Sequence, residues 1–242
     1  MKFALQADQR IEATPNALGV CPCCGTEMIA KCGNRKVWHW AHKTKQTCDH
    51  WWESETQWHR DWKNRFPVEW QEVVHKADDG EKHIADVKTP DGLVIEFQHS
   101  YIRPEERVSR ENFYGNMIWI VNGRRAKNDL KRLEKYHEYS SKPPWYTWTG
   151  RSYRFDGFEA DEHLPKAWLY SKVNVYFDWG YVNLPGHYVN GNFAPPWNSH
   201  LICLEPESSN TAQKPFYRRT LHAIDKTKFL ANLKSRYNEA PF

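Results

Sequence analysis

Apolar and polar residues alternate most regularly between residues 83 and 100, where two runs rich in Val, Ile and Phe flank the turn sequence Thr-Pro-Asp-Gly. This pattern predicts a β-hairpin with strands at 83–89 and 93–100. The periodicity around the hairpin predicts a helix within 49–65, a strand at 68–75, a helix at 104–114, a strand at 117–121 and a basic helix at 127–139. The order along the chain is therefore one helix, three strands, one helix and one strand.

The second half of the chain gives weaker signals. From residue 143 onward, short aromatic runs alternate with Pro, Gly and Asn, which predicts an irregular β-rich region that ends in a helix at 226–236. Aromatic side chains there could stack on unpaired bases, but in a chain that is 15% aromatic they more often belong to a core. No motif in this half indicates a reaction.

The predicted hairpin carries two acids, and the alternation of side chains along a strand decides which face each of them lies on. Asp86 and Lys88 share one face of the first strand, and Glu96 and Gln98 share one face of the second. Two acids that face each other across paired strands can hold a hard cation such as Mg²⁺ or Mn²⁺. Polar residues on a solvent-exposed face of a hairpin would have the same spacing, so spacing alone leaves both interpretations open.

The predicted helix within 49–65 carries a second set of candidates. Glu55, His59 and Lys63 recur every four residues, so they lie along one stripe of this helix. The stripe is either a row of ion pairs on the surface or a group that projects into a cleft beside the hairpin. A neutral imidazole has a pKa near physiological pH, which suits a proton acceptor or a phosphate contact.

The predicted helix at 104–114 carries a third set. Arg107, Arg110 and Tyr114 follow at offsets of three and four, so they share a face and are candidates for contacting DNA. Glu106 and Glu111 lie close by in the sequence. A salt-bridged helix surface is therefore an equally good interpretation of this set.

Five of the six cysteines fall within the first fifty residues, and such clustering favours a metal site over disulfides. Cys21 and Cys24 form a CxxC pair, and His39 and His42 follow in His-Trp-Ala-His. Two thiolates and two imidazoles satisfy a tetrahedral, structural Zn²⁺. The credible substitutes are Cys23, Cys32, Cys48 and His50. We expect the metal to stabilise the segment 15–48, which is too short to bury a core by itself.

Length, hydropathy and charge limit what kind of protein this is. With 242 residues the chain can form one large domain, or one domain with a substantial appendage. A mean hydropathy of −0.86 without a long apolar run, and an N-terminus without a secretory signal, predict a cytoplasmic protein. The net charge of +4 is mild, but residues 31–45 hold five basic and no acidic residues, and residues 124–135 hold six basic against two acidic. Either run could follow a phosphate backbone, or could be a solvated face.

Several motifs in succession resemble the competence protein CoiA-like family of the PD-(D/E)XK nuclease superfamily. They are CPxCG and HxAH, then ETxxHxxxK over residues 55–63, then HIADV, IEFQHS and RENFY. The resemblance covers about residues 15–125 and implies an α+β, restriction-endonuclease-like core of α-β-β-β-α-β order. On this basis we expect a segment 1–48 with a zinc-knuckle-like module, a nuclease-like core at 49–140, and a β-rich C-terminal region of unknown role at 141–242.

The resemblance further implies a deoxyribonuclease that depends on Mg²⁺ or Mn²⁺, with Asp86 and Glu96 as metal ligands. We expect the carbonyl of Phe97 to join them, Glu55 to complete the coordination directly or through water, and His59 to assist.

The sequence departs from the superfamily pattern at Gln98, where a lysine is usual. An amide can hydrogen-bond and orient a water molecule but offers no positive charge. Lys88, on the face of Asp86, is the expected replacement. We expect Lys63 to contact DNA, as do the candidates on the helix at 104–114.

The alternative function is a DNA-binding accessory protein for competence or recombination that retains the nuclease-like fold without hydrolysis. Zinc-dependent catalysis at the cysteine and histidine module is disfavoured, because four protein ligands leave no position open for water. The sequence does not predict strandedness, cleavage mode, oligomeric state or pathway.

Overall fold

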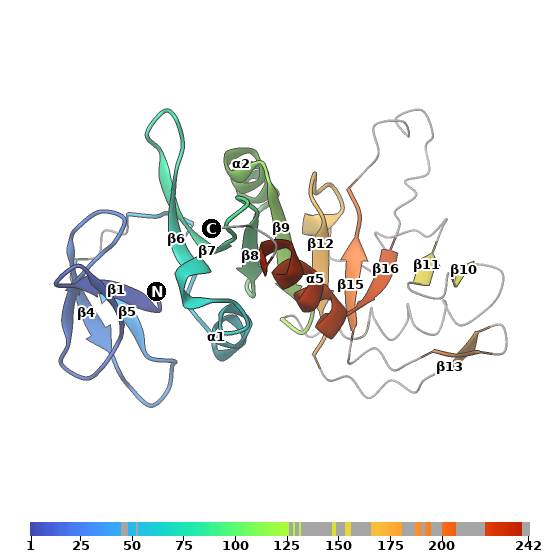
Figure 1. The fold of residues 1–242 in the computed structure, drawn as a ribbon, viewed down its shortest axis with the longest axis horizontal. Coiled ribbons are helices and arrows are strands. Elements are labelled where there is room, and N and C mark those ends of the chain that lie inside the picture. The colour runs from blue at the N-terminus through green and yellow to red at the C-terminus, as the bar shows by residue number, and fades with distance from the viewer. Residues whose placement is uncertain are drawn as a thin grey trace. The chain divides into compact units, whose positions relative to one another are not determined.

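The computed structural model is an α+β protein whose chain divides into two compact units, Met1–His99 and Ser100–Phe242 (Figure 1). The described residues are 1–44, 48–51, 53–125, 128, 131, 147–148, 153–155, 166–180, 187–189, 192–194, 200–206 and 221–238. The division into 1–48, 49–140 and 141–242 stays a prediction. Among the described residues, no helix is long and apolar enough to cross a membrane.

The first unit begins with a five-stranded antiparallel sheet in the order β2-β1-β3-β4-β5. Its strands are β1 (Phe3–Gln6), β2 (Gln9–Glu12), β3 (Leu18–Val20), β4 (Glu27–Lys31) and β5 (His39–His42). Met28 and Trp40 are fully buried in a small apolar cluster with Ala4, and the Trp40 indole donates to the Ile11 carbonyl over 3.0 Å. The metal module therefore has a core of its own, because strands upstream of residue 15 contribute to it.

The rest of the first unit consists of α1 (Gln57–Lys63), the 3₁₀ turn η1 (Val68–Trp70), β6 (Gln71–Lys76), β7 (Lys82–Lys88) and β8 (Val94–Gln98). The strands pair antiparallel, β6 with β7 and β7 with β8. α1 starts later than the pattern within 49–65 suggests, because Thr56 caps it. The Thr56 hydroxyl accepts the His59 amide, and His59 Nδ1 in turn accepts the Thr56 amide, which is a capping box that places His59 in the third helical position.

The second unit begins with α2 (Pro104–Tyr114), which has the predicted bounds, with Pro104 in its first turn and Gly115 at φ 64° after its end. The strands β9 (Met117–Asn122), β12 (Val175–Asp178), β15 (His200–Leu204) and β16 (Leu221–Asp225) follow. β12 runs parallel to β9 and antiparallel to β15, and β15 pairs antiparallel with β16, so the sheet is mixed. Trp119, Trp168 and Phe177 are fully buried.

Smaller elements complete the second unit. They are η2 (Lys166–Trp168), α5 (Lys226–Asn238) and the short strands β10 (Thr147–Trp148), β11 (Tyr153–Phe155), β13 (His187–Val189) and β14 (Asn192–Ala194). α5 begins at the residue predicted for the final helix and ends two residues beyond the predicted end. The predicted basic helix at 127–139 lies outside the described residues except for residues 128 and 131.

Candidate metal centre and carboxylate site

Three cysteines and one histidine meet at the end of the five-stranded sheet. The Sγ atoms of Cys21, Cys24 and Cys48 and a ring nitrogen of His42 all lie within 4.8 Å of one another. Cys21 Sγ is 3.7 Å from Cys48 Sγ, and Cys24 Sγ is 3.4 Å from His42 Nε2. Three thiolates and one imidazole in a closed group fit a structural Zn²⁺. The chain thus brings together ligands from the turn after β3, from β5 and from the segment after β5.

Cys24 is prepared for metal binding by its neighbours. Burial alone would raise the pKa of the Cys24 thiol, but hydrogen bonds with Thr26 and His42 outweigh burial and lower this pKa to about 6. Cys24 is then largely a thiolate at neutral pH, which is the form that binds a metal ion.

His39 was predicted as a zinc ligand but is not part of this cluster, and Cys48 takes its place. The reason is the strand geometry of β5. His39 and His42 are three residues apart on a strand, so their side chains point to opposite faces. His39 Nδ1 instead lies 2.8 Å from the Val37 carbonyl oxygen.

A row of acids crosses the strands β6, β7 and β8. The register pairs Gln71 with Val87 and Val73 with Ala85, so Glu72 on β6 lies opposite Asp86 on β7. The pairing of Val87 with Ile95 likewise brings Asp86 opposite Glu96 on β8. We call Glu72, Asp86 and Glu96 the acid row. The Phe97 amide donates to Asp86 Oδ2 over 3.0 Å, and the Asp86 amide donates to Glu96 Oε1 over 3.1 Å. The main chain of the neighbouring strand therefore holds each of these two carboxylates in place.

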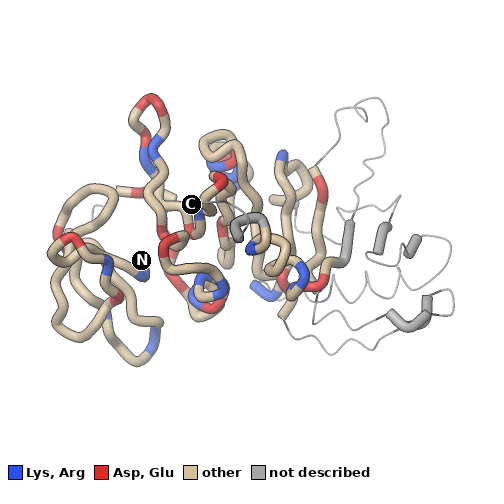
Figure 2. Tube along the Cα trace, viewed as in Figure 1, with Lys and Arg blue, Asp and Glu red and all other residues tan. Residues whose placement is uncertain are grey.

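Lys63 places its ammonium among acids from three elements. Its Nζ atom is 2.8 Å from Glu72 Oε1, 3.1 Å from Asp86 Oδ1 and 3.4 Å from Glu55 Oε1, and its side chain is 5% exposed. Burial disfavours the charged lysine, but Glu72, Asp86 and Glu55 outweigh burial and raise the pKa of Lys63 well above its usual value. Lysines, arginines and acids lie close together on and around α1 (Figure 2). Lys63 is therefore a permanent cation inside the carboxylate site.

Glu72 is a site residue that the sequence analysis missed. Besides Lys63, its carboxylate accepts the amides of Lys2 and Phe3 over 2.7 and 2.9 Å, which ties β1 to β6. Its backbone has a φ of 48°, a conformation that costs energy in a residue other than glycine. The sequence signal that could have found Glu72 is its position as an acid in the predicted strand at 68–75, which precedes the strand of Asp86.

Glu55, which contacts Lys63, and His59 make further contacts around this site. Arg60 donates to both Glu55 carboxylate oxygens over 3.0 and 3.1 Å. His59 Nε2 lies 3.1 Å from the Phe97 carbonyl oxygen, which was itself predicted as a metal ligand. His59 and Lys63 on α1 therefore contact the hairpin, and all three residues are buried. Glu55 lies before the capping residue Thr56, so the predicted helical stripe is wrong for Glu55.

Two lysines, Lys88 and Lys63, could supply the positive charge that Gln98 lacks, and their surroundings differ. Lys88 Nζ lies 3.1 Å from His75 Nδ1 on β6, whereas Lys63 Nζ lies at Asp86. Gln98 is buried on β8. The ammonium that contacts Asp86 in this structure therefore comes from α1.

The arginines of α2 are held within their own unit. Arg107 donates to both Glu111 oxygens over 2.6 and 2.7 Å, and Arg110 pairs with Glu106. Both arginines and Tyr114 are buried. These contacts match the salt-bridged interpretation of the helix more closely than an accessible DNA contact.

Asp49 connects the metal centre to the hairpin. It follows Cys48 directly, and its carboxylate contacts His83 Nδ1 over 2.8 Å and accepts the Ile84 amide over 3.0 Å. The Trp51 ring stacks on the His83 ring with centroids 3.3 Å apart. The segment that closes the cysteine cluster is thus attached to the beginning of β7, the strand of Asp86.

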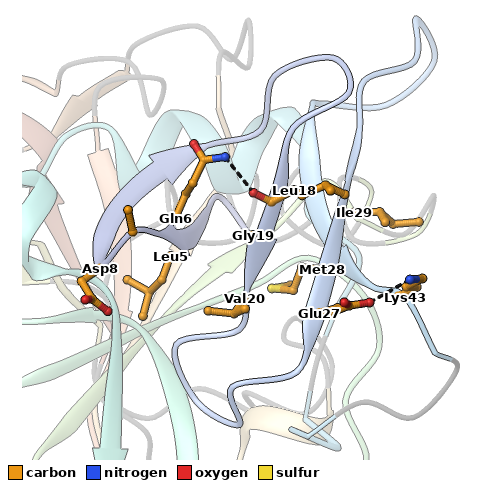
Figure 3. A pocket seen from close by; sticks show the side chains of 11 residues that line it. Leu5, Gln6, Asp8, Leu18, Gly19, Val20, Glu27, Met28, Ile29 and Lys43 are labelled. Carbon is orange, nitrogen blue, oxygen red and sulfur yellow. Dashed lines mark hydrogen bonds and ion pairs between the residues drawn. The ribbon is translucent and has the colours of Figure 1, made fainter.

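A separate surface pocket of about 380 Å³ lies on the five-stranded sheet (Figure 3). Leu5, Leu18, Val20 and Met28 line it from β1, β3 and β4. An exposed ion pair of 2.7 Å between Glu27 and Lys43 lies at its side. This pocket is mainly apolar and includes none of the predicted site residues.

A comparison with protein families finds a match to one short segment of the chain. Residues 9–50 match the family model described as "Competence protein CoiA, N-terminal domain". This segment contains β2 to β5 and all four members of the cysteine and histidine cluster. No curated protein and no solved structure matches the chain.

Proposed function

We propose that this chain is a deoxyribonuclease that depends on a divalent metal ion, with a PD-(D/E)XK-type core in which the acid row and Lys63 form the hydrolytic site. The observation that carries the proposal is the contact of Asp86 with Glu96 across β7 and β8, next to an ammonium 3.1 Å from Asp86. The chain order α1, β6, β7, β8, α2, β9 supports it. The match of residues 9–50 to a competence-protein domain supports work on DNA, in uptake or recombination.

The donor chemistry of the site suits Mg²⁺ or Mn²⁺, which take carboxylate and carbonyl oxygens. Asp86 Oδ2 and Glu96 Oε1 each accept one amide in this structure, and a carboxylate oxygen can accept a second interaction. Asp86 and Glu96 would hold the ion. When bound, a divalent ion polarises the phosphate and lowers the pKa of a coordinated water molecule.

Lys63 supplies the positive charge that Gln98 cannot offer. A preorganised ammonium in a buried site stabilises charge that develops on the phosphate, because little solvent reorganises around it. Lys63 is buried and held by three carboxylates, so its position is set before substrate binds. We therefore assign to Lys63 the role that the sequence analysis gave to Lys88.

His59 positions the Phe97 carbonyl. Its Nδ1 accepts the Thr56 amide, so the ring hydrogen lies on Nε2 and is donated to the Phe97 carbonyl oxygen. With both ring nitrogens engaged, His59 orients the end of β8 next to Glu96 and does not need to transfer a proton.

Cleavage by the purified, zinc-loaded chain tests the proposal. We expect single-stranded, double-stranded or branched DNA to be cut with Mg²⁺ or Mn²⁺, and the Asp86→Asn change to lower the rate by about 100-fold or more. The matched control is Asp78→Asn, an exposed acid in the loop between β6 and β7, which should cut like the wild type. No cleavage with any of these substrates and metals would refute the nuclease assignment.

Substitutions at two lysines test the assignment of the charge. We expect Lys63→Met to lose most cleavage, and Lys88→Met to keep it. Lys63→Arg keeps a cation at the site and should restore folding and part of the activity if Lys63→Met fails to fold. Loss of activity in Lys88→Met alone would return the role to Lys88.

One observation favours a second candidate function. Lys63 already balances part of the negative charge of Glu55, Glu72 and Asp86, as a site without a metal ion requires. A non-catalytic accessory protein for competence or recombination would bind DNA without metal-dependent cutting. The cleavage assay, run beside a binding assay with the same substrates, distinguishes the two functions.

A further inference from the structure

The connection between β4 and β5 carries an exposed aromatic ring within a basic segment. Residues 31–38, which we call the basic loop, run from the last residue of β4 to the residue before β5, have the sequence Lys-Cys-Gly-Asn-Arg-Lys-Val-Trp and contain no acid. Lys31, Arg35 and Lys36 are exposed, and none of them makes an ion pair with the described residues. The Trp38 side chain is also exposed, at 46%. The basic loop thus exposes one indole together with three cations of the same short segment.

The loop holds its tryptophan in a defined place. The Trp38 indole donates to the Gly33 carbonyl over 3.2 Å, so the ring is tied to the same loop that carries the basic residues. By contrast, Lys43, the next basic residue along the chain, is paired with Glu27 over 2.7 Å. The basic loop therefore combines an accessible ring with positive charge that no acid of the described residues neutralises.

The loop is also attached to the carboxylate site. The Trp38 carbonyl accepts from Arg60 over 2.8 Å, and the same guanidinium binds Glu55. Glu55 in turn contacts Lys63, whose ammonium is at Asp86. All these residues belong to the first unit, so a ligand bound on the loop would be held beside α1 and the acid row.

We propose that the basic loop binds single-stranded nucleic acid, with Trp38 stacking on an unpaired base and Lys31, Arg35 and Lys36 contacting the phosphates. A base in a duplex is already stacked on both faces, so an indole on a loop selects unpaired bases. A cation that contacts a phosphate releases a counterion bound to the strand, which favours binding. A cation without an acidic partner does not have to break an ion pair first. This inference rests on the proposed function in that it names the form of substrate presented to the acid row.

The test is binding of a fluorescein-labelled oligothymidylate of about 16 nucleotides, the upper end of the usual site size, followed by anisotropy. The full chain carries Asp86→Asn and is measured without added Mg²⁺ or Mn²⁺ and without chelator, so that zinc is retained and cleavage plays no part. Trp38→Ala should weaken binding about 5- to 150-fold, the range for loss of one stacked base. Binding to a duplex of the same length should change by less than about 2-fold.

The charged residues have their own readout and control. Removing Lys31, Arg35 and Lys36 together should make the slope of log K against log salt shallower by about 2, at about 0.7 per phosphate contact on a single strand. Lys43→Ala, a basic residue of the same module that is already paired, should leave the slope unchanged.

Unchanged affinity in Trp38→Ala and in the triple variant would overturn the proposal. Equal losses for single strand and duplex would also overturn it. Because no cleavage is measured, a chain that binds through Trp38 but never cuts would refute the nuclease and leave this inference intact.

Discussion

Replacement of Glu72 by glutamine tests the energetics of the carboxylate site. Burial alone would raise the pKa of Glu72, but the charges of Lys63 and of the Met1 ammonium, together with hydrogen bonds from Lys63 and the Lys2 amide, outweigh burial and lower this pKa from 4.5 to about 2. A difference of this size between folded and unfolded states corresponds to about 3 kcal/mol of stability. The folded-state pKa is the lower one, so this stability is complete above the unfolded pKa and is lost as the pH falls towards about 2.

The Glu72→Gln variant should therefore be less stable than the wild type by about 3 kcal/mol at pH 7, and the gap should narrow steadily below pH ~4.5. The assay is urea unfolding followed by far-UV circular dichroism, from neutral pH to the lowest pH at which the wild type unfolds cooperatively. The control is Glu69→Gln, an exposed acid one turn earlier, which should follow the wild type. A gap that stays constant with pH would show that the Glu72 charge does not stabilise the fold.

Three further predictions concern other parts of the chain. Cys48→Ala should lower bound zinc from about one per chain to near zero, whereas His39→Ala should keep it, as measured by metal analysis. Gly123→Ala should destabilise the second unit by about 1–3 kcal/mol in thermal unfolding, because a Cβ atom there would lie 2.5 Å from Trp179 ring atoms. Glu111→Gln should cost about 3–5 kcal/mol in the same assay, because it leaves a buried guanidinium without its carboxylate.

Local pattern predicted the elements that depend on neighbours in sequence. The strands of the hairpin, the helix that begins at Pro104 and the helix that begins at Lys226 all have short-range signals: alternation, a proline in the first turn, or a run of helix-forming residues. α1 started later than expected because a single capping residue, Thr56, outweighed the apolar periodicity before it.

Contacts between distant segments were the part that pattern could not predict. Cys48 joins Cys21 only because the chain returns past β5, and spacing cannot show that return. Glu72 gains its role from the amides of Lys2 and Phe3, about seventy residues earlier in the chain. The burial of Arg107 likewise depends on how α2 packs and not on its own sequence.

The attachment of Asp49 to the Ile84 amide and to His83 has a consequence for the order in which the protein matures. Asp49 follows a candidate zinc ligand, so the loop that anchors β7 is restrained only once the cysteine cluster has closed. We expect hydrogen exchange of the Ile84 amide to be faster in the zinc-free protein, and equal rates with and without zinc would argue against this coupling. The hydrolytic site proposed above would then be fully assembled only in chains that have acquired zinc.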